Sequence, residues 1–330
     1  MMTLSINQGD YRLLDIMKFV MAIVVVAIHS HPDFFVSSEI ARELIGIIYT
    51  LAVPFFFMAS GFLLFRKIDI TSTDDTDLRL KTYIYRICKL YIVWTIIYMP
   101  LTIYGFIKDG STLIDSMLIF IRNFFLVGEN YMSWPLWYLL ALIVSVIIIK
   151  VLLKLKFTKI GILLFGVCLA IIGVLLDYCK EHNILPSLVD VYFALFSKTR
   201  NGFFVGLLYV SLGMWCSKLK NMQLITIAAL LIIGVIGCAY KLPLANTLIV
   251  LGLFILTVVT KINITPLLSY KFRLISTIVY LIHMIFISVL QICFNVRFGL
   301  FLFASAYALS LIASIVLIRF KETKLFKMLF

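Results

Sequence analysis

The sequence predicts an all-α, polytopic integral membrane protein with about ten transmembrane helices. Apolar residues make up 63% of the 330 residues, whereas a soluble domain is roughly half apolar, and the mean hydropathy is +1.11. Apolar stretches of about 20 residues, the length that spans a bilayer, follow one another from near residue 12 to near residue 319. No long polar stretch divides them, so we expect one membrane domain over residues 1–330.

The hydropathy pattern places the membrane spans in order along the chain. They are 12–31, 44–65, 82–106, 134–153, 158–177, 200–217, 223–240, 243–260, 273–295 and 298–319. The segment 112–127 is too short and too polar for an ordinary span, and its apolar side chains recur at helical spacing. We therefore expect 112–127 to form an interfacial helix on the outer side of the membrane.

The charge pattern sets the orientation. With the N-terminus inside, most of the 29 Lys and Arg residues fall in loops on the cytoplasmic side, and just over half of the 16 acidic residues fall outside. This is the asymmetry of the positive-inside rule, so the net charge of +13 needs no nucleic-acid partner. Both termini should be cytoplasmic. The six cysteines lack CxxC or Cys/His metal spacing, and we expect neither a disulfide framework nor a metal site.

The first span carries three ionisable residues where a plain membrane helix has none: Asp15, Lys18 and His29. Lys18 and His29 are eleven residues apart, which places them on one helix face about 16 Å apart along the axis. A charge at bilayer depth costs a few kcal/mol or more unless it faces protein or water, so we expect this stripe to line a cavity. The alternative is an internal ion pair of Asp15 with Lys18, with His29 reaching the outer interface. No A-x-A cleavage pattern follows, so the span should stay attached.

Two further segments place polar groups at mid-depth or near the cytoplasmic face. Ser60 and Gly61 let a ligand or a neighbouring helix approach the second span closely, and helix packing is the simpler interpretation. Arg86 and Lys89, one helical turn apart, suit a phosphate-bearing ligand. They could equally reach anionic lipid head groups.

Candidate residues also occur at the outer ends of spans and near the membrane centre. Trp137 has the position of an interfacial aromatic belt. Arg200, followed by Asn201, opposes both the helix dipole and the positive-inside trend, which favours a place in a site. His283 and Tyr280, one turn apart near the bilayer midplane, fit either a site or a neutral buried histidine.

In their order and spacing, these residues resemble the acyltransferase 3 family of ten-span bacterial membrane proteins and, within it, the membrane domain of the VanT-type serine racemases. The resemblance covers nearly the whole chain. It rests on the Lys18 to His29 spacing, VPFFFMASGFLLFRK, the pair Arg86 and Lys89, WPLWYL, RNGFFVGL and the late YLIH. Lysines 18 and 89 stand where the family usually has arginines, and lysine lacks the planar fork that grips phosphate. The soluble racemase domain of VanT proteins has no counterpart in these 330 residues, so we expect no racemisation by that route.

The resemblance implies a membrane-bound O-acyltransferase of the bacterial cell membrane. It would move an acyl group, first of all acetyl, from cytoplasmic acyl-CoA to a hydroxyl of an acceptor on the envelope side. Acyl-CoA is then a co-substrate, and no permanently bound cofactor is expected. The acceptor could be an envelope glycan, a peptidoglycan precursor or a small hydroxyl compound.

The resemblance also implies roles for the candidate residues. His29 would be the general base, Lys18 would hold the pantetheine arm or the oxyanion, and Asp15 would keep Lys18 charged and oriented. The cofactor, acyl-CoA, would be bound by Arg86, Lys89 and Ser60. The acceptor side is assigned to Arg200, Asn201, Trp137, Tyr280 and His283.

A transporter or binding protein for serine or another small amino acid is the alternative function. Polar stripes inside a membrane also serve substrate pathways, and this function has been suggested for VanT membrane domains. The ten predicted spans show no clear inverted repeat of the kind that many transporters have. Membrane lipid is a partner under either function, and the oligomeric state is left open by the sequence.

Overall fold

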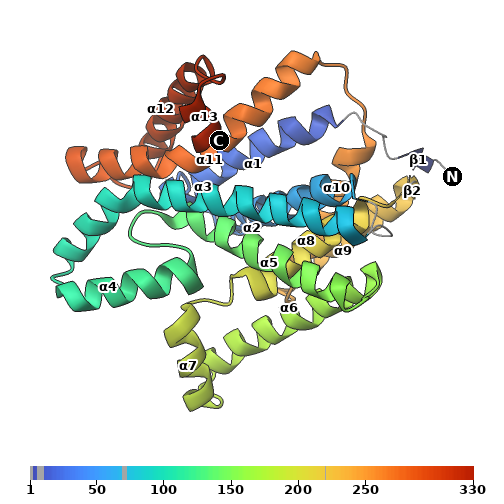
Figure 1. The fold of residues 1–330 in the computed structure, drawn as a ribbon, viewed down its shortest axis with the longest axis horizontal. Helices are drawn as coiled ribbons and strands as arrows, with labels where there is room; N and C mark the ends of the chain where they lie inside the picture. The colour runs from blue at the N-terminus through green and yellow to red at the C-terminus, as the bar shows by residue number, and fades with distance from the viewer. Residues whose placement is uncertain (1–2, 6–10, 69–72, 220) are drawn as a thin grey trace. The chain divides into compact units, whose positions relative to one another are not determined.

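The computed structural model describes residues 3–5, 11–68, 73–219 and 221–330. This part of the chain is almost wholly helical (Figure 1), which confirms the predicted fold class. Within it, seven helices are long and apolar enough to cross a membrane. They are α1 (Arg12–Ser30), α2 (Glu39–Phe65), α3 (Thr73–Lys108), α5 (Trp137–Lys154, preceded by the 3₁₀ turn η2, Trp134–Leu136), α6 (Lys159–Glu181), α11 (Pro266–Phe294) and α12 (Leu300–Ile318).

The remaining predicted spans coincide with shorter apolar helices. These are α8 (Leu207–Cys216, preceded by the π-helical turn η3, Gly202–Gly206), α9 (Leu224–Ala239) and α10 (Ala245–Val259). All ten predicted spans are therefore helical. Two short helices were not predicted: α7 (Pro186–Phe196) and the C-terminal α13 (Lys324–Leu329).

The chain divides into two compact units. The terminal unit comprises Met1–Ala59 and Lys218–Met328 with Phe330, and the middle unit comprises Ser60–Ser217 with Leu329. The division falls within α2, so this helix contributes residues to both units. The expectation of one domain over residues 1–330 stays a prediction.

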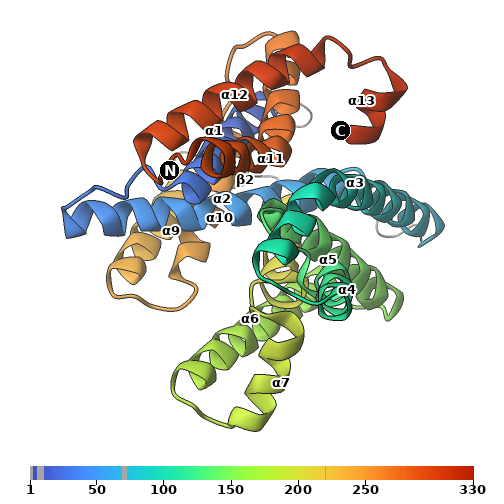
Figure 2. The ribbon, with the colours of Figure 1, turned by 90° about the vertical axis from the view of Figure 1, so that its left-hand side faces the viewer.

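In the terminal unit, α1 packs along α11, α11 along α12, and α9 along α10 (Figures 1 and 2). A short strand β1 (Thr3–Ser5) precedes α1 and pairs antiparallel with β2 (Asn221–Gln223), which precedes α9. The segments leading into α1 and α9 therefore lie side by side. The charge pattern assigns both of them to the cytoplasmic face.

In the middle unit, small residues bring helices together. Gly166, Ala170 and Gly173 form the buried stripe of α6, which packs against α8 and η3. A Cβ at Gly61 of α2 would collide with the main-chain carbonyl of Val210 in α8. Close backbone approach through small residues is the usual packing mode of helices in lipid, and it confirms the packing interpretation of Gly61.

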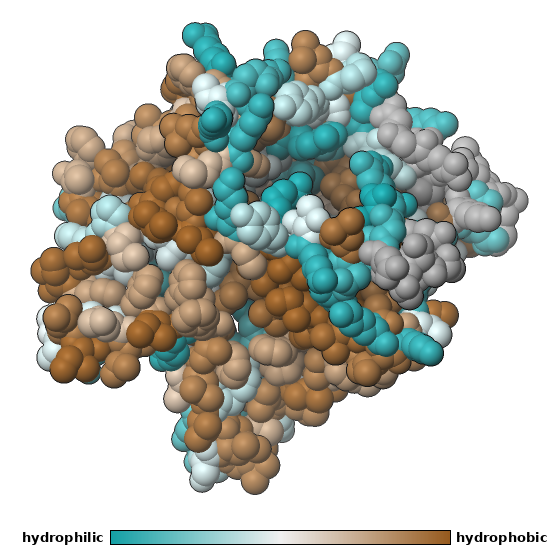
Figure 3. All heavy atoms as spheres, in the orientation of Figure 1, coloured by the Kyte–Doolittle hydropathy of each residue, from teal (hydrophilic) through white to brown (hydrophobic). Residues whose placement is uncertain are grey.

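Large apolar side chains are also exposed on helices of the middle unit, and hydrophobic surface dominates α6 and α7 (Figure 3). On α6 they include Ile160, Leu164, Ile171, Ile172 and Leu175. So much apolar surface is typical of a helix that faces lipid rather than water.

The segment 112–127 forms α4 (Leu113–Arg122), which continues into the π-helical turn η1 (Asn123–Val127). The Thr112 hydroxyl caps α4 by accepting from the backbone N–H of Asp115 at 3.2 Å. None of its side chains is buried, and its exposed apolar face includes Leu113, Ile114, Met117, Leu118 and Ile121. The predicted helix is confirmed, and its place at the outer membrane surface stays a prediction.

Candidate functional site

A pair of histidines joins α1 to α11 inside the terminal unit. The rings of His29 and His283 stack with centroids 5.4 Å apart and planes at 28°. His283 is completely buried and His29 is half-buried. Tyr280, one turn before His283, lies 6.3 Å from its ring and packs edge-on against Phe56 of α2. The structure thus brings together three of the predicted residues from opposite ends of the sequence.

The hydrogen bond of His283 fixes its tautomer. Its Nδ1 lies 3.0 Å from the carbonyl oxygen of Val279. A carbonyl only accepts, so we assign the proton of the neutral ring to Nδ1, which leaves a lone pair on Nε2. Nε2 is buried and has no hydrogen-bond partner among the described residues. A buried polar atom left unpaired costs about 1–3 kcal/mol, and such an atom calls for a ligand or water at that position.

Asp15, on the same helix as His29, is bound to α11. Its Oδ2 accepts from Ser269 Oγ at 2.7 Å and from Arg273 Nη2 at 2.8 Å, and its Oδ1 accepts from Arg273 Nε at 3.0 Å. Only 4% of Asp15 is exposed. The predicted pairing of Asp15 with Lys18 is wrong, because the two-pronged guanidinium satisfies both carboxylate oxygens at once. Lys18 lies half-buried on α1.

The predicted cofactor residues lie in the middle unit. Ser60 Oγ is 2.8 Å from the hydroxyl of Tyr138 on α5. It also interacts with the side chain of Tyr83. The Arg86 guanidinium lies over the ring of Tyr83, 5.3 Å from its centroid. Tyr83 therefore links Ser60 to Arg86, and both Arg86 and Lys89 are exposed.

Two predicted acceptor residues meet beside a small cavity at the N-terminal end of α5. The exposed Arg200 guanidinium lies 4.9 Å from the centroid of the buried Trp137 ring. The cavity of about 100 Å³ is mostly apolar, and its lining includes Phe125, Trp137 and Phe203. Residues of both π-helical turns, η1 and η3, line it. Turns of this kind often occur at functional sites.

Asn201 supports the wall of this cavity. Its Oδ1 accepts from the N–H groups of Phe203 and Phe204 at 3.0 and 3.3 Å, which caps η3. Its Nδ2 donates to the Tyr192 hydroxyl at 2.7 Å and to the Lys198 carbonyl at 3.3 Å. Burial raises the pKa of Tyr192 to about 12, so this hydroxyl stays protonated at neutral pH. The amide of Asn201 is thus engaged by the protein, and its contact with an acceptor stays a prediction.

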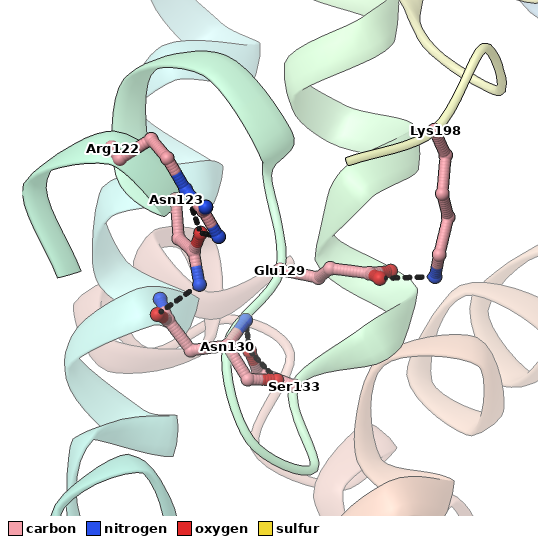
Figure 4. Close-up of polar contacts among 6 residues, drawn as sticks. All are labelled: Arg122, Asn123, Glu129, Asn130, Ser133 and Lys198. Carbon is pink, nitrogen blue, oxygen red and sulfur yellow. Dashed lines mark hydrogen bonds and ion pairs between the residues drawn. The ribbon is translucent and has the colours of Figure 1, made fainter. Parts of the chain in front are cut away.

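A polar cluster next to the cavity, shown in Figure 4, was missed by the sequence reasoning. Lys198 and Glu129 form an ion pair at 2.5 Å. The Arg122 guanidinium donates to Asn123 Oδ1 and also to the carbonyl of Ala194 at 3.1 Å. The bond to Ala194 ties the end of α4 to α7, and the ion pair ties the loop after η1 to the chain that leaves α7. The side chains of Asn123, Asn130 and Ser133 continue the network into the loop before α5.

Within the described ranges, no group of three or more His, Cys, Asp or Glu side chains is placed to hold a metal ion.

Comparison with known proteins places this geometry in context. Residues 11–319 match the acyltransferase 3 family model, described as an acyltransferase domain. The chain is 29% identical over 232 residues to a serine/alanine racemase of Enterococcus gallinarum, a match that covers 68% of this chain and 32% of that protein. It is 30% identical over 217 residues to an amino-acid racemase of Enterococcus faecalis, covering 64% and 29% respectively. The chain thus spans about a third of the length of the curated relatives it matches. No solved structure matches.

Proposed function

The chain belongs to the acyltransferase 3 family, and from this premise we propose that it is a membrane-bound O-acyltransferase that carries an acyl group from cytoplasmic acyl-CoA to an envelope-side hydroxyl. The acyl group is acetyl in the first instance, and the membrane is the bacterial cell membrane. The observation that carries this proposal is the stacked pair of His29 and His283, in which a buried imidazole nitrogen has no partner among the described residues.

His29 acts as the general base in this mechanism. A neutral imidazole, with an unperturbed pKa near 6.5, removes the proton from the acceptor hydroxyl as its oxygen attacks the thioester carbonyl. The carbon–sulfur bond then breaks, and the CoA thiolate leaves with the proton that His29 holds. Lys18, on the same helix, stabilises the oxyanion or holds the pantetheine arm.

The proposed binding roles fall on residues of the middle unit. Arg86 and Lys89, both exposed, attract the nucleotide phosphates of CoA. Ser60, linked to Arg86 through Tyr83, contacts the pantetheine arm. Arg200 and Trp137 bind the acceptor at the cavity that Asn201 supports. The acceptor is an envelope glycan, a peptidoglycan precursor or a small hydroxyl compound.

Binding or transport of serine is a second candidate, favoured by the name of one relative, a serine/alanine racemase. That name describes a protein about three times as long as the matched region. Under this function, His29 and His283 would line a path for the amino acid rather than a reaction site.

The two functions are separated by one pair of measurements on purified protein in proteoliposomes. We expect ¹⁴C-labelled acetyl groups to pass from acetyl-CoA to extracted envelope material in a protein-dependent manner. We also expect no uptake of labelled serine above empty vesicles. Serine uptake without any acetyl transfer would overturn the proposal in favour of transport.

A further inference from the structure

Helices α1 and α11 meet in one register along their length. Asp15 contacts Ser269, and His29 contacts His283, so both contacts join residues 254 apart in the sequence. Fourteen residues separate the two contacts on each helix, which is about 21 Å of helix. Two such contacts at equal spacing mean that the helices run parallel. Each residue of α1 in this stretch is then level with the residue of α11 that lies 254 positions later in the sequence. The rings of Phe19 and Phe272, 5.2 Å apart, lie between the two contacts.

The contact at Asp15 is the one that resists sliding. The carboxylate is buried and receives three hydrogen bonds, two of them from the rigid fork of Arg273. Bidentate pairs of this kind are specific in geometry as well as strong. A shift of α11 by one helical turn, about 5.4 Å, would break all three bonds and leave a buried charge. Apolar contacts such as Phe19–Phe272 tolerate such a shift far better.

Two other hydrogen bonds hold α1, one near the Asp15 contact and one near the histidine pair. The Arg12 guanidinium donates to the carbonyl of Ile264, just before α11 begins. At the far end of α1, the Ser30 carbonyl accepts from the N–H of Gly299, just before α12 begins, at 3.0 Å. The histidine pair lies next to this second tie, whereas the Asp15 contact lies next to the first. A register set at the Asp15 end of α1 is therefore carried along this continuous helix to the histidine end.

We propose that Arg273 and Ser269, with Asp15 as their common acceptor, are positioning residues that set the axial register of α1 against α11. They thereby hold the ring of His29 over the ring of His283. Asp15 acts through this register and not through Lys18. The expected effect of the register on acyl transfer rests on the proposed function. The register of α1 against α11 is independent of that function.

Cysteine crosslinking measures the register without any enzymatic activity. The six native cysteines are first replaced, and His29→Cys is then combined with His283→Cys. Two shifted pairs place the second cysteine one turn earlier or later, as Tyr280→Cys or Ile287→Cys. With Asp15 and Arg273 intact, we expect a short bis-thiol reagent to couple the 29/283 pair at least fivefold faster than either shifted pair.

Arg273→Leu should then slow the 29/283 coupling at least fivefold and speed one of the shifted pairs. The gain at a shifted pair is a result that mere loss of stability would not give. Arg273→Lys and Ser269→Ala keep a charge or the ion pair, and should give intermediate shifts if the leucine variant does not fold. Arg297→Leu is the matched control, because Arg297 is exposed just beyond α11 and should leave all three rates unchanged.

Coupling of the 29/283 pair that stays within twofold of the parent in folded Arg273→Leu protein would overturn the positioning role. In protein that retains both histidines, Arg273→Leu should lower the kcat of acyl transfer at least tenfold and change the KM for acetyl-CoA less than twofold. A fall in kcat with unchanged coupling would also overturn the register mechanism. If Arg273→Leu shifts the coupling as expected but the parent protein transfers no acyl group, the register mechanism is supported and only the proposed function is overturned.

Discussion

The imidazole rings of His29 and His283 stack 5.4 Å apart, although 253 residues lie between them in the chain. The ring of His283 is held by its bond to the Val279 carbonyl, so it forms a fixed wall for the ring of His29. A general base must be oriented as well as basic, because proton transfer needs hydrogen-bond reach to the substrate. The pair supplies that orientation from two different helices.

The variant His283→Phe distinguishes the contribution of the aromatic ring from the contribution of its nitrogen atoms. Phenylalanine keeps an aromatic ring against His29 but removes the unpaired Nε2, which is a buried polar atom without a described partner. We expect the rate of acyl transfer to fall at least tenfold, while the midpoint of thermal unfolding in detergent changes by only a few degrees, because no satisfied tertiary hydrogen bond is lost. A variant that transfers acyl groups at the wild-type rate would show that Nε2 has no part in the reaction.

Asn201→Ala should destabilise the middle unit. The change removes the cap on the N–H groups of Phe203 and Phe204 and also the bond to Tyr192, and loss of the cap alone costs about 0.5–2 kcal/mol. Arg200→Ala is the comparison, since it removes an exposed cation–π contact of about 0.5–1 kcal/mol. Thermal unfolding should therefore show a larger drop for Asn201→Ala. The reverse order would contradict the capping role.

Gly61→Ala and Gly46→Ala form a matched pair within α2. A methyl group at Gly61 would collide with the Val210 carbonyl, whereas nothing lies within 4 Å of a Cβ at Gly46. Overpacking costs about 1–3 kcal/mol, and more where backbone must move. We expect Gly61→Ala to lower the yield of monodisperse protein and Gly46→Ala to leave it unchanged. Equal yields would mean that α2 and α8 do not pack as closely as described.

Replacing Arg86 and Lys89 together by glutamine should weaken the binding of acyl-CoA. If these exposed cations attract the nucleotide phosphates, the KM for acetyl-CoA rises about tenfold, which is 1.4 kcal/mol, and kcat stays the same. Acetyl-pantetheine, which lacks those phosphates, should react equally well with both proteins. Arg79→Gln on the same helix is the control, because Arg79 pairs with Asp75 at 2.7 Å. An unchanged KM would instead favour a contact with lipid head groups.

Much of the fold could be predicted because hydropathy is a local property of the sequence. Each of the ten predicted spans is a helix, and 112–127 is the separate helical segment that its amphipathic spacing indicated. The pairing of β1 with β2 could not be predicted, because each strand has only three residues and they meet across more than 200 residues. Helix α7 was missed because its sequence is too short to span a membrane.

Part of the arrangement of the candidate residues could be predicted, because helical periodicity is also a local property of the sequence. Spacing along one helix placed Lys18 and His29 on a common face. The unfavourable charge of Arg200 at an outer helix start singled out this residue, but nothing in the sequence indicated its contact with Trp137. The partner of Asp15 was assigned to the nearest cation in sequence, whereas the structure supplies Arg273 from 258 residues away. Periodicity within one helix carries no information about which helix lies opposite.

The most direct test of the histidine assignment is the rate at which purified protein consumes acetyl-CoA in the presence of acceptor, compared between wild type and His29→Ala. General-base catalysis contributes about 10²–10⁴-fold, so the variant should lose at least a hundredfold in rate while still eluting as folded protein. If His29→Ala consumes acetyl-CoA with acceptor as fast as wild type, then His29 is not the catalytic base.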